Sequence, residues 1–172
     1  MEIYFSLGSN QGDRYANMQR ALELLDKKLG VHWSALSSFI ETKPWGFESN
    51  ENFLNGVVKY ELPENRIFEH SSTNAHKNKN LAAGLNLLRI CKEIEYELGR
   101  RGEPVWDESG NRIYSDRPID IDILFMDTVR IESRDLNIPH SGIADREFVT
   151  IPLLQIVSDN IRKAFRDIFQ QK

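Results

Sequence analysis

The sequence predicts an α+β fold with the element order strand, helix, strand, strand, helix, strand. Three observations support this order. Short apolar segments with a period of two alternate with two longer segments of helical period. Gly, Pro and Asn residues separate these segments. The chain of 172 residues, 40% hydrophobic and 28% charged, is large enough for one buried core. The βαββαβ order is that of the ferredoxin-like fold, in which helices pack on one face of an antiparallel sheet.

The first half of the chain is expected to supply three of the strands and one helix. Asp13 is a suitable N-cap, and Gly30 is a suitable helix end. Pro44 and Gly46 break the segment that follows the second strand. The predicted elements are, in order, a strand at 2–7, a helix at 14–29, a strand at 31–40, a loop at 41–52 and a strand at 53–62.

The second half is expected to supply the other helix, the fourth strand and several additions. The long charged segment 100–116 has no clear period, and a loop of that length in a compact domain is usually functional. The predicted elements are a polar insert at 63–80 with a helical start near 65–69, a helix at 81–98 ended by Gly99, the loop at 100–116, a strand at 119–125, a short partner strand at 128–131, a short helix or extended piece up to 156 and a terminal amphipathic helix at 160–169. We expect a single domain over 1–172.

Composition excludes several classes of protein. The net charge of −4 provides no overall field that would attract nucleic acid or anionic membrane. The single cysteine, Cys91, excludes an internal disulfide and a cysteine-based zinc cluster, and its apolar helical surroundings indicate a small core residue. The N-terminal residues do not resemble a signal peptide, and no run of about 18 apolar residues is present. We expect a cytoplasmic monomer with small-molecule substrates and no nucleic-acid or membrane partner.

The most informative segment is RPIDIDILF at 117–125. Isoleucines and Phe125 alternate with Asp120, Asp122 and Leu124, which predicts a strand with both carboxylates on one face, roughly 6.5–7 Å apart. Two such carboxylates suit divalent cations that are shared with phosphate, and Arg117 adds a cation. The alternative is the solvated face of an amphipathic strand, which a bare D-x-D motif favours. Aspartate is depleted in strands and Arg117 could pair with phosphate, and both details shift the balance toward a metal site.

Other segments carry weaker signals. The turn at 8–13, GSNQGD, lacks the lysine of a phosphate-binding loop and indicates a tight turn and helix cap. The loop TKPWG at 42–46 offers an exposed aromatic that could cover a substrate. Asn55 follows Phe53 closely, and an amide beside an aromatic suits a flat heterocycle because it donates and accepts hydrogen bonds. A core Phe with a turn Asn is the alternative.

Two further groups are candidates for phosphate contacts. Glu95, Arg100 and Arg101 lie around the end of the second long helix, where arginines also complement the helix dipole. His140 follows a proline in a loop, and Arg146 lies six residues further along the chain.

Six short segments occur in a fixed order over residues 3–156. They are GSNQGD, ETKPWG, FLN, IEYELGR, DRPIDIDIL and IPH with its following R-x-F. Together they resemble the 6-hydroxymethyl-7,8-dihydropterin pyrophosphokinases of folate biosynthesis. These enzymes transfer a pyrophosphoryl group from ATP to the hydroxymethyl group of a reduced pterin and release AMP.

The resemblance implies roles for individual residues. Asp120 and Asp122 correspond to ligands of two Mg²⁺ ions and, with Arg100 and Arg117, to the catalytic group. The residues that correspond to the ATP site are Glu95, Arg100, Arg101, Arg117, His140 and Arg146. The residues that correspond to the pterin pocket are Thr42, Pro44, Trp45, Phe53, Asn55 and Phe148. The loops at 41–52 and 99–116 are expected to close over ATP.

Some positions depart from the family pattern. Relatives often have a tryptophan just before the acidic strand, where this chain has Tyr114, and Trp106 lies further upstream. Either residue could stack on a ligand. Glu147 is acidic beside Arg146 and is expected to point away from phosphate. Two other functions remain as alternatives: a non-catalytic ferredoxin-like nucleotide- or RNA-binding module, and a pterin-binding aldolase of the same pathway. The acidic pair argues against the first, and the Arg117–Asp122 run against the second.

Overall fold

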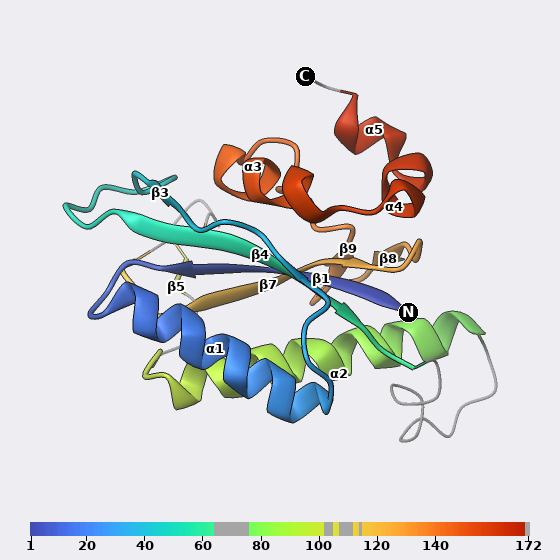
Figure 1. Ribbon diagram of the computed structural model, residues 1–172, viewed down its shortest axis with the longest axis horizontal. Helices are drawn as coiled ribbons and strands as arrows, with labels where there is room; N and C mark the ends of the chain where they lie inside the picture. Colours follow the sequence, from blue (N-terminus) through green and yellow to red (C-terminus); the bar gives the residue numbers. More distant parts are fainter. Residues whose placement is uncertain (64–75, 102–104, 107–111, 114, 171–172) are drawn as a thin grey trace.

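The computed structural model describes residues 1–63, 76–101, 105–106, 112–113 and 115–170 (Figure 1). Most of the predicted insert at 63–80 and Tyr114 therefore lie outside the described residues. The elements are β1 (Glu2–Ser9), α1 (Arg14–Leu29), β2 (Ala35–Leu36), β3 (Ile40–Thr42), β4 (Phe53–Glu61), α2 (His76–Glu97), β5 (Val105–Trp106), β6 (Arg112–Ile113), β7 (Asp120–Met126), β8 (Ile131–Glu132), β9 (Asn137–Ile138), α3 (Glu147–Ile156), α4 (Asp159–Ala164) and α5 (Arg166–Phe169).

The main sheet has the order β2-β4-β1-β7, with β3 also paired to β4, and every pairing in it is antiparallel. The mixed α/β architecture with an antiparallel sheet is as predicted. The single strand expected at 31–40 is wrong, because β2 and β3 are separate and β3 extends into the expected loop. At the interruption the register against β4 shifts by one residue, and the Ser37 hydroxyl, in place of a backbone carbonyl, accepts a hydrogen bond of 2.9 Å from the Val57 N–H.

Helices cover both faces of this sheet (Figure 1). α1 and α2 lie against one face, as expected, whereas α3, α4 and α5 lie against the other. The expectation that helices pack on one face only is therefore wrong. The two layers of helices give the sheet two hydrophobic cores, one on each side.

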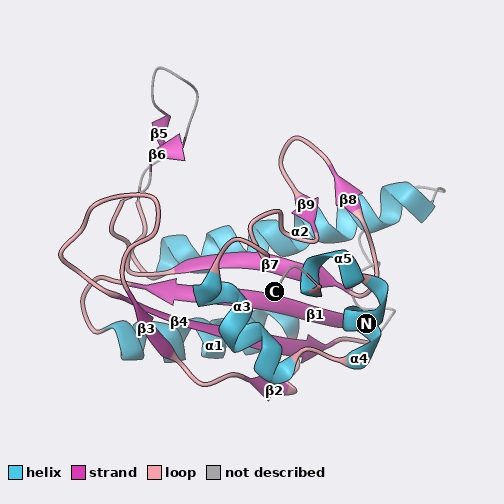
Figure 2. Ribbon diagram, turned by 90° about the horizontal axis from the view of Figure 1, so that it is seen from above, coloured by secondary structure: helices cyan, strands magenta, loops and turns pink. Residues whose placement is uncertain are grey.

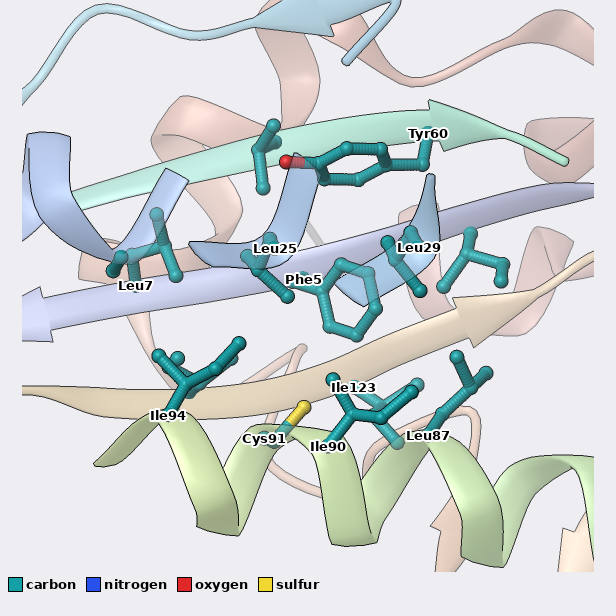
Figure 3. Close-up of a cluster of buried hydrophobic side chains, with 14 of the residues drawn as sticks. Phe5, Leu7, Leu25, Leu29, Tyr60, Leu87, Ile90, Cys91, Ile94 and Ile123 are labelled. Carbon is teal, nitrogen blue, oxygen red and sulfur yellow. The ribbon is translucent and has the colours of Figure 1, made fainter. Parts of the chain in front are cut away.

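The larger core lies between the sheet, α1 and α2 (Figure 3). Phe5 at its centre packs edge-to-face on Tyr60, with ring centroids 5.9 Å apart. Cys91 is fully buried in this core, and burial raises the pKa of its thiol. It is therefore the small apolar core residue that its helical surroundings indicate.

The ends of α1 match the signals in the sequence. The Asp13 side chain accepts a hydrogen bond of 3.0 Å from the Ala16 N–H, and Gly30 ends the helix in the left-handed region at φ 66°. α2 begins at His76, five residues before the predicted start at 81, and Gly99 follows its end with φ 97°. A residue with a Cβ atom would be strained at both glycine positions.

β7 carries the acidic segment and has a register shift against β1 between Tyr4 and Phe5. Ile121 and Ile123 point into the larger core, and Asp120 and Asp122 lie on the opposite face. Because of the shift, Leu124 and Phe125 both join the second core, so the expectation that Phe125 continues the isoleucine face is wrong.

The C-terminal third differs from the prediction in two respects. The short strand expected at 128–131 as a partner of the acidic strand is instead β8, which pairs with β9. The terminal helix expected at 160–169 is two short helices, because Phe165 between them adopts φ −122° and ψ 49° while its side chain is buried in the second core. Among the residues that the structure describes, no helix has the length and apolar character needed to cross a membrane.

Candidate active site

A concave pocket opens on the sheet face that carries Asp120 and Asp122, beside the start of α3. It encloses about 540 Å³, counting space that is open to solvent. β1, β3, β4 and β7 supply its floor, and the loop around 43–47 and the start of α3 at 146–148 supply its walls. Its lining residues are Ser6, Leu7, Gly8, Thr42, Lys43, Trp45, Phe47, Phe53, Asn55, Arg117, Asp120, Asp122, Arg146 and Phe148.

The two aspartates of the pocket have different surroundings. Asp120 forms ion pairs with Arg100 and, at 3.0 Å, with Arg117. Burial alone would raise the pKa of Asp120, but the Arg117 and Arg100 guanidinium groups outweigh it and hold the pKa below its usual range. The Asp122 carboxylate has no hydrogen bond or ion pair from any described residue. Asp122 therefore offers both carboxylate oxygens to a ligand, whereas Asp120 would share its oxygens with the two arginines.

Glu95 anchors this arrangement from below. It is only 2% exposed and lines neither this pocket nor the second hollow described below. Its carboxylate accepts hydrogen bonds of 2.8 Å from the Ile121 N–H, Arg100 and Lys92. Glu95 thus fixes both the start of β7 and the Arg100 guanidinium. Its position favours a supporting role beneath the site rather than the ligand contact that the sequence suggests.

Aromatic side chains form the outer part of the pocket. The Trp45 and Phe148 rings lie beside each other, with centroids 6.4 Å apart and planes tilted by 56°, and the Arg146 guanidinium lies 4.6 Å from the Trp45 ring centroid. Trp45 is 46% exposed, whereas Phe53 is buried at the base of the pocket. These rings give the pocket apolar surfaces on which a flat ligand can stack.

Asn55 lies at the floor of the pocket and is 4% exposed. Its Nδ2 donates a hydrogen bond of 2.8 Å to Thr42 Oγ1. A Cβ atom at Gly8 would lie only 3.0 Å from Asn55 Oδ1, so a larger residue there would press on the amide. Of the residues predicted for the pterin, Thr42, Trp45, Phe53, Asn55 and Phe148 line this pocket, and Pro44 does not.

A second hollow lies on the other side of Asp122, between α2 and the segment that carries β9. Asp122 lines both hollows. In the second one, Lys92 and Arg134 supply cations, and His140 has its Nδ1 occupied by the Gly142 N–H at 3.1 Å. Its lining residues are Leu88, Lys92, Asp122, Ile123, Arg134, Asp135, Leu136, Asn137, His140 and Ser141.

Comparison with known proteins agrees with this geometry. The family model for 7,8-dihydro-6-hydroxymethylpterin-pyrophosphokinase (HPPK) matches residues 4–158. The chain belongs to this family. A 2-amino-4-hydroxy-6-hydroxymethyldihydropteridine pyrophosphokinase of Porphyromonas gingivalis is 38% identical over 155 residues, which are 90% of this chain and 89% of the relative.

Two other relatives show the range of the HPPK family. The pyrophosphokinase of Aquifex aeolicus is 32% identical over 167 residues, which cover 95% of this chain and 85% of the relative. The folic acid synthesis protein fol1 of Schizosaccharomyces pombe is 35% identical over 156 residues, but these cover 91% of this chain and only 18% of that longer protein. The HPPK unit thus occurs both alone and as a part of larger proteins.

The structure separates the residues that the sequence assigns to ATP in this HPPK chain. Arg117 and Arg146 line the first pocket, and His140 lines the second hollow. Arg101 is directed elsewhere: its guanidinium stacks on Tyr96 at 3.8 Å and bonds to the Tyr96 carbonyl oxygen.

Sequence reasoning missed several lining residues. Lys43 and Phe47 line the first pocket and lie in the loop predicted at 41–52, but no sequence motif marks either of them as a ligand contact. Lys92 and Arg134 come from elements distant in sequence, so only the fold brings them to Asp122. Trp106 is 59% exposed on the β5–β6 pair, which lies away from the main sheet (Figure 2).

Proposed function

We propose that this chain catalyses transfer of a pyrophosphoryl group from ATP to the hydroxymethyl group of 6-hydroxymethyl-7,8-dihydropterin, giving the pterin diphosphate and AMP. The observation that carries the proposal is the position of Asp122 between two hollows of different chemistry. One hollow has aromatic rings and a buried amide, and the other has cations and a histidine. Family membership supports the same reaction.

The pterin fits the first pocket. A pterin is a flat heterocycle with hydrogen-bond donors and acceptors along one edge. The Trp45 and Phe148 rings supply aromatic surface for stacking, while Asn55, held by Thr42, presents an amide to that edge. A buried amide discriminates strongly against molecules that leave it unpaired.

ATP fits the second hollow, with its phosphates extending toward Asp122. Lys92, Arg134 and His140 provide hydrogen-bond donors there, and Arg117 and Arg146 lie on the pterin side. The β-phosphate would then lie between the two groups of cations, next to the pterin hydroxyl. Such alignment supplies most of the rate enhancement in phosphoryl transfer.

We propose Asp120 and Asp122 as the protein ligands of Mg²⁺. The number of ions is proposed to be two, as the family resemblance of the sequence implies. Carboxylate oxygens are the donors that Mg²⁺ prefers, and it usually completes its shell with water and phosphate oxygens. The described residues contain no cluster of three or more His, Cys, Asp or Glu side chains that could hold a metal, so phosphate would have to complete the site. When bound, Mg²⁺ neutralises phosphate charge and polarises the oxygen atoms it touches.

The arginines provide the rest of the electrostatic stabilisation. The pterin hydroxyl oxygen attacks the β-phosphorus and releases its proton to water. The bond from that phosphorus to the α,β-bridging oxygen breaks, and AMP leaves with the bridging oxygen. Arg117 and Arg100, already fixed beside Asp120, are placed to stabilise the negative charge that develops on this oxygen. No described carboxylate other than Asp120 and Asp122 lines the first pocket, so no separate general base is assigned.

Finer aspects of the fold belong to the same proposal. The order β2-β4-β1-β7, with α1 and α2 on one face, supports a ferredoxin-like core. A cytoplasmic, monomeric enzyme that acts on small molecules is part of the same proposal, and the net charge of −4 provides no overall attraction for nucleic acid. An RNA-binding sheet is not favoured, because the open face of this sheet carries two carboxylates that would repel phosphate.

An AMP-release assay tests the proposed function. The protein is incubated with ATP, Mg²⁺ and 6-hydroxymethyl-7,8-dihydropterin, and AMP and the pterin diphosphate are quantified by chromatography. We expect the two products in equal amounts, and none when the pterin or Mg²⁺ is left out. A folded protein that binds ATP but releases no AMP would contradict the proposal.

A further inference from the structure

Asn10 makes contacts that its place in a turn motif does not explain. It follows the end of β1 and is only 1% exposed. Its Oδ1 accepts a hydrogen bond of 2.8 Å from the Arg117 N–H, and its own N–H donates to the Arg117 carbonyl oxygen at 3.2 Å. Asn10 therefore holds the backbone of Arg117 on both sides.

The Asn10 amide also joins two other segments. Nδ2 donates a hydrogen bond of 2.6 Å to the Asp116 carboxylate and lies 3.5 Å from the carbonyl oxygen of Glu51. Glu51 belongs to the loop between β3 and β4, and Asp116 ends the long segment that leads to β7. A single buried side chain thus connects both loops that flank the pocket.

The chemistry of these contacts requires an amide. One end of the side chain must accept from a backbone N–H, and the other must donate to a carboxylate. An aspartate at this position would keep the first contact but face Asp116 with a second carboxylate. Alanine would lose both contacts and leave a buried N–H unpaired.

The fixed backbone determines where the Arg117 side chain lies. Its guanidinium pairs with Asp120 at 3.0 Å and lies 5.3 Å from the Phe53 ring centroid, so it is directed across the base of the pocket. Arg100 reaches the same carboxylate, but Glu95 holds it by its guanidinium. The two arginines are therefore anchored in different ways, one at the backbone and one at the head group.

We propose that Asn10 is a positioning residue for pyrophosphoryl transfer, which acts by fixing Arg117 and by joining the 43–52 loop to the segment that precedes β7. This inference rests on the proposed function. Asn10 itself lines neither hollow, so its effect on the reaction passes through Arg117.

An exchange of partners provides the test. Asn10→Asp should lower kcat by about 100-fold, which is typical when a catalytic group is displaced by about 1 Å. The double variant Asn10→Asp/Asp116→Asn restores one amide and one carboxylate at the contact with their roles exchanged, and it should recover most of kcat. KM for ATP should change less than kcat, because Lys92, Arg134 and His140 are untouched.

Asn17→Asp is the matched control. Asn17 donates to the Gln11 carbonyl oxygen and to Ser9 in the same turn but does not touch Arg117. It should lower the melting temperature without changing kcat. Should Asn10→Asp fail to fold, Asn10→Ala replaces it, and we expect the same direction of change in kcat for folded protein.

The outcomes separate this inference from the function on which it rests. If the unmodified chain releases no AMP, the proposed function is wrong. Two outcomes would contradict the positioning role when the unmodified chain is active. In the first, Asn10→Asp has the same kcat as the unmodified chain. In the second, kcat falls with the melting temperature to the same extent in the Asn10 and Asn17 variants. Recovery of kcat in the exchanged pair supports the positioning role.

Discussion

The sheet face opposite α1 and α2 has a covered half and an open half. Where α3, α4 and α5 cover it, the strands present Tyr4, Val57, Leu124 and Phe125. Where no helix covers it, the same strands present Ser6, Gly8, Asn55, Asp120 and Asp122. β1, β4 and β7 each contribute to both halves.

The difference shows how one set of strands serves two purposes. In the covered half, the register shift in β7 places Leu124 and Phe125 together under the helices, which increases the apolar area that is buried. In the open half, small and polar side chains leave a hollow and give it charge. The C-terminal helices thus stabilise the sheet and define where the pocket begins, and Arg146 and Phe148 at the start of α3 form the border.

The largest expected effect of a single substitution is on stability, in the covered half. Phe165 is 1% exposed and packs on Phe125 with ring centroids 5.2 Å apart. Phe165→Ala should lower the free energy of unfolding by about 3–5 kcal/mol, because it leaves a cavity in the second core. Urea denaturation measures the loss, and kcat for the protein that remains folded should stay unchanged.

Phe165→Leu is the milder companion, and it should recover a large part of the lost stability. A tenfold lower kcat in well-folded Phe165→Ala protein would show that the two halves are not independent.

In the open half, the largest expected effect is on the reaction. Asp122→Asn keeps the shape of the side chain but removes the charge between the two hollows. We expect kcat to fall at least about 10²–10³-fold, the range for loss of one group that stabilises the transition state. Stability should change little, because no described residue pairs with this carboxylate.

Asp167→Asn is the control for this variant, since Asp167 forms an exposed ion pair with Arg130 on the covered side. It should have normal kcat, because surface ion pairs contribute little. Near-normal activity of Asp122→Asn would refute its assignment as a metal ligand.

The comparison also shows what the sequence could reveal about the fold. The strands, the first helix and its caps were predictable because periodicity and capping residues are local signals. The break between β2 and β3 was not, since it depends on the Ser37 side chain bonding to the Val57 backbone of the neighbouring strand. The packing of α3, α4 and α5 on the second face of the sheet was not predicted either. The pattern of an amphipathic helix does not show which face of a sheet the helix will cover.

For the site, the acidic strand and the aromatic loop were found because their residue types are unusual in those positions. Lys92 and Arg134 were not found, because charged residues on helices and turns are common and only tertiary contacts give them a role. The role of Arg101 stays a prediction. Its sequence position beside Arg100 suggests a phosphate contact, and in the structure its guanidinium stacks on Tyr96 and lines neither hollow.

A smaller effect on binding is expected at the floor of the open half. Asn55→Ala removes the amide and leaves Thr42 Oγ1 without its donor. Affinity for the pterin should fall by about 1–3 kcal/mol, roughly 5–150-fold, the usual loss for a buried hydrogen-bonded group. Calorimetric titration with the pterin and separately with ATP measures both.

ATP affinity should be preserved, because Asn55 does not line the second hollow. Thr42→Val is a useful partner variant: it keeps the volume but not the acceptor, so it should produce a smaller loss. An equal loss of both affinities in Asn55→Ala would indicate that Asn55 is structural.

The smallest effect is a pH-dependent one at the far end of the covered half. Glu2 accepts a hydrogen bond of 2.6 Å from Ser158 and pairs with Lys59 at 2.7 Å, which links β1, β4 and the start of α4. Burial tends to raise the pKa of Glu2, but Lys59 and Ser158 outweigh it, and the folded pKa lies below the ordinary 4.5. The charged form is therefore favoured in the folded state.

The sign of the effect follows from this shift. The stabilisation by Glu2 is present above the pKa of the unfolded chain and is lost as pH falls through the lower folded pKa. Glu2→Gln should therefore reduce the free energy of unfolding by about 1 kcal/mol at pH 7, with a difference from the unmodified chain that shrinks below about pH 4. Urea denaturation at pH 7 and pH 3 measures this change.

Glu97→Gln is the control, because it alters only a loose, exposed contact of 4.0 Å with Arg20, and its free energy of unfolding should equal that of the unmodified chain at either pH. If Glu2→Gln lowers the free energy of unfolding equally at both pH values, the shape of the side chain at this junction matters and its charge does not. The covered half would then depend on packing alone.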